Sequence, residues 1–157
     1  MDLFVLLLFL HALGAIVAFG PGFAAMVVGP MVAREPQHAN FYARTQVATA
    51  RRIVMPVSIS MAVTGVGMIL DLGWENITGG RHWLEVGILI YVAAIIVSIA
   101  VQAPAGAKLV ALTSTPPAPG TPPPPEIQAT VGRIRVGGML LSAMVVAIAF
   151  LMVTKPF

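Results

Sequence analysis

The sequence contains no cysteine and few charged residues, and both shortages restrict what the protein can be. Only 10% of its residues are charged, whereas about 25% are charged in a typical soluble domain. Without cysteine the chain has no disulfide, no iron–sulfur cluster, no covalently attached c-type haem and no thiolate metal site. Any haem or metal must therefore be held by histidine, methionine, a carboxylate or an amine.

Clustered charge and common catalytic motifs are missing as well. The nine Lys and Arg residues exceed the six Asp and Glu residues, so the net charge is +3. The basic residues form no run of five or more, which argues against a nucleic-acid partner. We find no glycine-rich phosphate loop, no HExxH motif, no Ser-His-Asp set with plausible spacing and no paired intramembrane carboxylates. No catalytic residue is therefore assigned.

What the sequence does contain is apolar residues, in four long blocks. It is 58% hydrophobic with a mean hydropathy of +0.92, and each block has the roughly 20 residues needed to cross a bilayer. We predict an all-α fold, a single transmembrane domain over residues 1–157, with helices at about 3–28, 53–70, 83–103 and 136–153. The first block carries Asp2 and no basic residue before a long apolar stretch, which favours a retained helix over a secretory signal.

Prolines and glycines divide these blocks. Pro21, between two glycines, is expected to bend the first helix, because proline removes an amide donor. Pro56 falls in the first membrane turn of the second helix and Gly65 near its middle, and both are expected to have structural roles. Pro104 is expected to weaken any continuation of the third helix. Residues 113–127 are predicted to form a proline-rich cytoplasmic loop in a polyproline II conformation.

The distribution of basic residues predicts the orientation. The connections between the first and second helices and between the third and fourth hold seven Lys and Arg residues, against two elsewhere. The positive-inside rule makes these two connections cytoplasmic, which places both termini outside. Short connections favour an up-and-down bundle, and Trp74 and Trp83 are expected to form an aromatic belt at the outer interface. The bilayer is thus one expected partner.

His11 is the candidate site residue, because an ionisable side chain about 12 Å inside a membrane helix is costly to bury. Two interpretations are open. In the first, His11 is a ligand, either axial to a b-type haem or bound to copper. In the second, it is a neutral histidine that is hydrogen-bonded to a carbonyl or hydroxyl of a neighbouring helix. His82 lies at the interface, at a different height from His11, which argues against a bis-histidine haem. A methionine is an alternative second ligand, although methionine is more often packing material; the candidates are Met61, Met68, Met139, Met144 and Met152.

Four segments carry a family resemblance: LHALGAIVAFG, RRIVMPVSISMAVTG, HWLEVGILI and the closing LMVTKP. Together they resemble a family of predicted bacterial integral membrane proteins of unknown function, which implies a multi-pass protein of the bacterial inner membrane. More distantly, the first segment is similar to the copper-resistance-D-type membrane domain and the membrane protoporphyrinogen oxidase. That oxidase binds b-haem through a histidine that corresponds to His11. Its important lysine corresponds to Gly87, so the resemblance does not extend to the oxidase reaction.

Three functional hypotheses follow. The first is a non-catalytic accessory or assembly subunit of a membrane complex, with other membrane subunits as partners. The second is a haem- or copper-binding redox or transfer protein centred on His11. The third is a small-solute transporter that uses the bends at Pro21 and Pro56, which would need polar side chains along a path.

Overall fold

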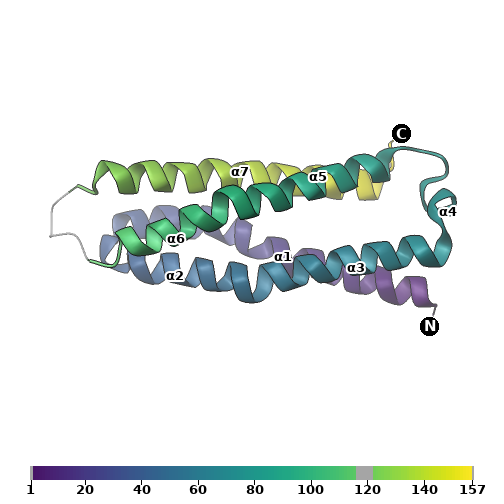
Figure 1. Ribbon diagram of the computed structural model, residues 1–157, viewed down its shortest axis with the longest axis horizontal. Coiled ribbons are helices and arrows are strands. Elements are labelled where there is room, and N and C mark those ends of the chain that lie inside the picture. Colours follow the sequence, from purple (N-terminus) through teal and green to yellow (C-terminus); the bar gives the residue numbers. More distant parts are fainter. Residues whose placement is uncertain (1, 116–121, 157) are drawn as a thin grey trace.

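The computed structural model describes residues 2–115 and 122–156, which form helices and connections with no β-strand among them. Four long helical segments lie side by side, and both chain ends lie at the same end of the molecule (Figure 1). All four are long and apolar enough to cross a membrane, which confirms the predicted all-α transmembrane class. They are α1 (Leu3–Arg34); α2 (Ala39–Thr49) with α3 (Met55–Leu72); α5 (Trp83–Val97) with α6 (Ala103–Leu112); and α7 (Pro125–Thr154).

Short elements complete the chain. The 3-10 turn η1 (Pro36–His38) leads into α2, and α4 (Trp74–Thr78) is a single turn between α3 and α5. Two π-helical turns, η2 (Ala50–Val54) and η3 (Ser98–Gln102), join α2 to α3 and α5 to α6. We call the end of the molecule that carries α4 and the chain termini the terminal end, and the opposite end, which carries η1, the basic end.

The helices extend well beyond the predicted spans. The four segments have 32, 37, 30 and 30 residues, although about 20 suffice for a bilayer. The first helix continues past the predicted end at residue 28 to Arg34, and the helix that leads into the second span begins at Ala39 rather than near residue 53. The surplus of roughly 10 to 17 residues adds about 15 to 25 Å per segment.

Prolines lie within the helices without ending them, and the bend expected at Pro21 stays a prediction. Pro21 and Pro30 both lie inside the continuous helix α1. The third segment was predicted to weaken after residue 103, yet it continues to Leu112. Here η3 immediately precedes the Pro104 turn, as η2 precedes Pro56. A π turn changes which carbonyl each amide reaches, so the helix can continue where proline supplies no amide donor.

The end of the proline-rich connection is also helical. Residues 113–127 were predicted to be a loop, but α7 already begins at Pro125, with Pro124 in an extended conformation at its N-cap. Proline suits the first turn of a helix, because the amide it lacks would have no partner there and its φ angle is already helical. The rest of the predicted loop includes residues 116–121, which lie outside the described residues.

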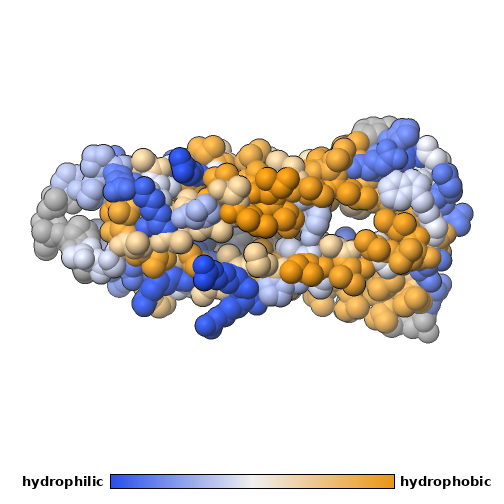
Figure 2. All heavy atoms as spheres, in the orientation of Figure 1, coloured by the Kyte–Doolittle hydropathy of each residue, from blue (hydrophilic) through white to orange (hydrophobic). Residues whose placement is uncertain are grey.

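The two ends of the molecule pack differently. At the basic end α2 packs against α6, α6 against α7 and α1 against α2, so all four segments meet. Toward the terminal end α1 packs along α3 and α5 along α7. A space-filling view shows an opening between these two pairs, bordered mainly by apolar residues (Figure 2). We call this gap the opening.

A small apolar core closes the terminal end. Trp83, which is 3% exposed, packs with Leu84 and Leu151, and Ile69 and Trp74 pack against this cluster. The Nζ atom of Lys155 lies 5.3 Å from the centre of the Trp83 ring. The side chain of Trp83 is thus buried at the terminal end, and the aromatic belt of Trp74 and Trp83 stays a prediction.

Candidate functional site

His11 joins α1 to α3 through one nitrogen. Its Nδ1 atom lies 3.0 Å from the carbonyl oxygen of Met61 and 3.1 Å from the Thr64 hydroxyl. The ring is partly buried between the two helices. These hydrogen bonds are the ones expected if His11 is a structural histidine, held by a carbonyl and a hydroxyl of the neighbouring helix.

These two contacts decide the position of the ring proton. The Met61 carbonyl can only accept a hydrogen bond, so Nδ1 must carry the hydrogen and donate it. The Thr64 hydroxyl is placed to donate to the carbonyl of Ser60 or Met61, 3.0 and 3.1 Å away, so its oxygen can accept from His11. In a neutral ring the Nε2 atom then keeps its lone pair. Such a tautomer, fixed by a backbone carbonyl, is the one in which histidine ligates metals through Nε2.

Two glycines allow the close approach of α1 and α3. A Cβ atom on Gly65 would lie 3.4 Å from Cε1 of His11, and one on Gly14 would lie 2.7 Å from Cγ of Met61. Gly65 therefore leaves room for the His11 ring. Met61, only 5% exposed, fills the space above Gly14, so its thioether is a packing group in this arrangement.

Two of the second ligands that the sequence suggested for His11, His82 and Met152, make contacts with other residues. His82 is exposed near the terminal end and bonds Glu85 at 3.0 Å. The methyl group of Met152 lies 3.2 Å from the Cβ position of Gly87, and Met139 is exposed. Among residues 2–115 and 122–156, no three His, Asp or Glu side chains gather closely enough to hold a metal. His11 alone would supply one ligand.

One face of α3 borders the opening. Ser58, Ala62, Gly65 and Ile69 recur at the spacing of helical turns and so lie on one face. We call this face the α3 wall. It contacts the α5/α7 pair at two points, near Ser58 and near Ile69. The Tyr91 hydroxyl donates to the Ser58 carbonyl at 2.6 Å, and Ile69 packs on the Trp83 cluster.

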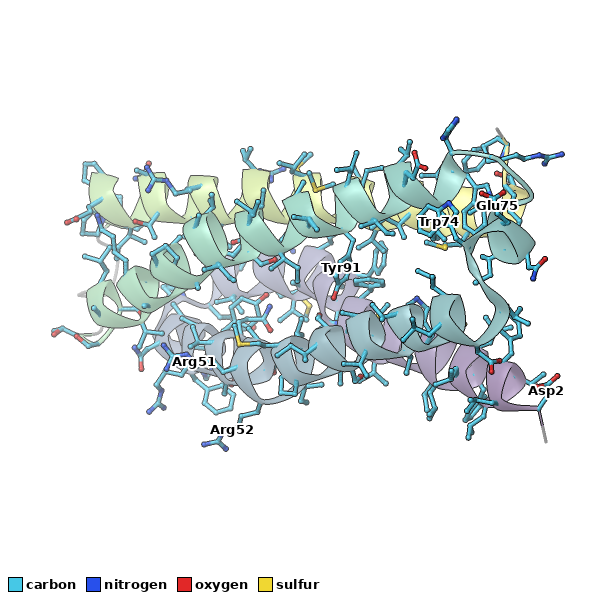
Figure 3. All side chains as sticks on the ribbon, turned by 45° about the vertical axis from the view of Figure 1, so that its right-hand side comes forward. Asp2, Arg51, Arg52, Trp74, Glu75 and Tyr91 are labelled. Carbon is cyan, nitrogen blue, oxygen red and sulfur yellow. The ribbon has the colours of Figure 1, made fainter. Side chains whose placement is uncertain are left out.

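Between those two contacts the α3 wall carries only small side chains. Ala62 is exposed, and Gly65 is covered by the His11 ring. Figure 3 shows Tyr91 reaching from α5 toward α1 and α3, with Trp74 at the terminal end. The opening is thus bounded by Tyr91 on one side and by the Trp83 cluster on the other, and His11 lies beside it.

The sequence interpretation missed three polar side chains that connect helices. Tyr91 is one, and Gln102 Nε2 donates to the Ile134 carbonyl at 3.1 Å. Asn40 Nδ2 donates to the Val110 carbonyl at 3.0 Å and to the Thr113 hydroxyl at 3.1 Å. Each of them is an isolated polar residue within or beside an apolar run, and this pattern predicts a hydrogen bond to another helix. In the sequence only His11 was singled out by it.

A small-solute transporter would need polar side chains along a path, and three of the serine and threonine hydroxyls in the spans are bonded locally. Ser60 donates to Val57, Thr64 to Ser60 or Met61, and Ser98 to Ala94, each within its own helical segment. Ser60 is exposed on the outer surface, whereas the Ser58 side chain is buried. These bonds occupy the hydroxyl hydrogens within the helices, and the transporter hypothesis gains no support from them.

Sequence comparison agrees with the architecture. A family model described as "Predicted integral membrane protein (DUF2269)" matches residues 5–156. No curated protein matches the chain, and no solved structure does.

Proposed function

Because this chain belongs to the family of predicted integral membrane proteins DUF2269, we propose that it is a non-catalytic accessory or assembly subunit of a larger membrane complex. The observation that carries the proposal is the opening between the α1/α3 and α5/α7 pairs (Figure 2). In this proposal a transmembrane helix of the partner packs against the α3 wall.

The side chains of the α3 wall support a helix as the partner. Membrane helices associate without a hydrophobic driving force between them, so they favour small residues that let two backbones approach closely. Ala62 is the exposed small residue of the α3 wall, whereas Ser58 is buried and Gly65 is covered by the His11 ring, so in this proposal the partner helix approaches at Ala62. The neighbouring face of α3 carries large exposed residues instead, among them Ile59, Val63 and Val66, as expected where lipid is the only neighbour.

The polar groups also favour a binding role over catalysis. His11, Tyr91 and Gln102 each bond a backbone carbonyl of another helix. These bonds hold the bundle together and leave few groups to act on a substrate. A complex subunit needs a defined shape more than it needs reactive side chains.

The proposal is tested by filling the opening. Ala62→Leu adds three carbons on the α3 wall, and Val63→Leu places the same leucine side chain, one carbon larger than valine, on the lipid-facing side. We expect the protein extracted from its native membranes in mild detergent to migrate as a larger complex. Ala62→Leu should release it as a monomer, and Val63→Leu should leave the complex intact. A wild-type protein that runs as a monomer and copurifies with nothing would contradict the proposal.

A specific observation keeps a second function open, the binding of b-type haem or copper at His11. With Nδ1 donating to Met61, the lone pair of Nε2 is available to a metal. His11 would hold the iron or copper ion, and the metal would supply redox chemistry. The test is the visible spectrum after haem supplementation, together with copper analysis. A Soret band or bound copper should be lost in His11→Ala and kept in His82→Ala; their absence from the wild-type protein rules this function out.

We further propose that the protein lies in the bacterial inner membrane with both termini outside. Seven of its nine basic residues lie toward the basic end, in the regions that the positive-inside rule assigns to the cytoplasm. With this orientation, the surplus helical turns at the basic end project into the cytoplasm.

A further inference from the structure

The outward face of α2 and η2 combines an aromatic ring with arginines. Phe41, Arg44, Thr45 and Ala48 recur at helical spacing and line a shallow hollow of about 220 Å³. Phe41 is 66% exposed although it is large and apolar. About one turn after Ala48 come Arg51 and Arg52, both exposed.

The π turn η2 carries these two arginines away from the bundle. Arg51 and Arg52 lie within η2, and Figure 3 shows both side chains pointing away from the other helices. Figure 2 shows hydrophilic side chains projecting from this part of the molecule, next to an apolar zone. Directly after them the exposed residues become apolar, beginning with Ile53 and continuing with Met55 and Ile59. The change from basic to apolar occurs within one turn.

The position of this change matches the membrane boundary. From the end of η2 to Leu72 the helix has almost the 20 residues that cross a hydrocarbon core of about 30 Å. When Leu72 lies at one interface, Arg51 and Arg52 therefore lie at the level of the opposite headgroups. Arg44 lies about two turns beyond them, on the water side of the headgroup layer.

Carboxylates do not neutralise these arginines. Among the described residues of the basic end, Glu35 lies 3.6 Å from His38 and Glu126 lies 2.7 Å from Lys108. The described residues contain no carboxylate within ion-pair distance of Arg44, Arg51 or Arg52. Three guanidinium groups thus face the headgroup layer with their charge uncompensated by the protein.

We propose that Arg44, Arg51 and Arg52 form a binding site for an anionic phospholipid. Guanidinium groups bind phosphate through paired hydrogen bonds, and basic residues next to a membrane span attract anionic lipid. The phosphate lies against Arg51 and Arg52, Arg44 and the hollow beside Phe41 hold the outer part of the headgroup, and an acyl chain runs along Met55 and Ile59. This site is on the outer surface of the bundle and is independent of the partner proposed for the opening.

The test compares phosphatidylglycerol with phosphatidylcholine. The full-length protein in uncharged detergent is titrated with each lipid, and bound lipid is counted by native mass spectrometry. We expect phosphatidylglycerol to bind at least about tenfold more tightly. Each Arg→Gln change should weaken its binding about fivefold, and R44Q/R51Q/R52Q about a hundredfold, while binding of phosphatidylcholine stays the same.

A matched control separates a site from general attraction. R51Q/R52Q and R133Q/R135Q remove the same charge, but Arg133 and Arg135 lie on α7. Only R51Q/R52Q should lose phosphatidylglycerol. Equal losses from both variants, equal binding of the two lipids, or competition by soluble glycerol phosphate at the same concentration would each overturn the proposal. If the triple variant does not fold, the binding of phosphatidylglycerol and of phosphatidylcholine is compared for Arg44→Gln alone.

Discussion

Single polar side chains connect the helices of this protein. In an apolar medium an unpaired polar group is costly, so an isolated histidine, tyrosine or glutamine must find a partner on another helix. His11, Tyr91 and Gln102 all do so through backbone carbonyls. Each such bond contributes about 0.6 kcal/mol on average in membrane proteins. Close packing at small residues must therefore supply the remaining specificity, and Gly14 is the tightest such contact.

We predict that Gly14→Val destabilises the protein and that Gly20→Val does not. A Cβ atom at Gly14 would lie 2.7 Å from Cγ of Met61, whereas at Gly20 it would meet nothing within 4 Å. Both positions lie on α1, so helix propensity cancels in the comparison. Overpacking of this kind costs about 1–3 kcal/mol. Unfolding in mixed micelles with increasing dodecyl sulfate measures the difference, and equal stability of the two variants would show that α1 and α3 do not pack at Gly14.

At the scale of elements, the π turns explain why prolines were poor guides to helix ends. Pro56 and Pro104 each follow a π turn, and the helix continues through both. The helix beginnings were hard to predict for another reason. Residues 39–52 are polar enough to resemble a loop, yet they form α2 and η2 by packing on α6 and α1. Such tertiary contacts override local polarity, and no local pattern in the sequence records them.

We predict that Pro104→Ala narrows the opening. Alanine restores the missing amide, so η3 can return to the α-helical pattern and change the direction of α5 relative to α6. Spin labels at the exposed residues Leu70 and Leu89 report the distance between α3 and α5. The mean distance should become shorter in Pro104→Ala. Pro21→Ala, in a helix without an adjacent π turn, should leave it unchanged. An unchanged distance in Pro104→Ala would mean that η3 does not shape the opening.

At the scale of the whole molecule, hydropathy was sufficient to predict four membrane helices and an all-α fold. It could not predict that the bundle closes at the basic end and separates into two pairs at the terminal end. That difference depends on which faces meet, and all four helices are apolar on most sides. His11 could be identified from its charge and depth. The nitrogen that it leaves free could not, because this depends on the Met61 carbonyl of another helix.

The opening is the feature on which the proposed function depends, and photocrosslinking inside it tests that function most directly. A photoreactive phenylalanine analogue is placed at Ala62, on the α3 wall, or at Val63, on the neighbouring exposed face, in cells of the native host. We predict that the Ala62 position crosslinks to one other membrane protein and that the Val63 position gives only lipid adducts. Lipid adducts alone from both positions would contradict the account.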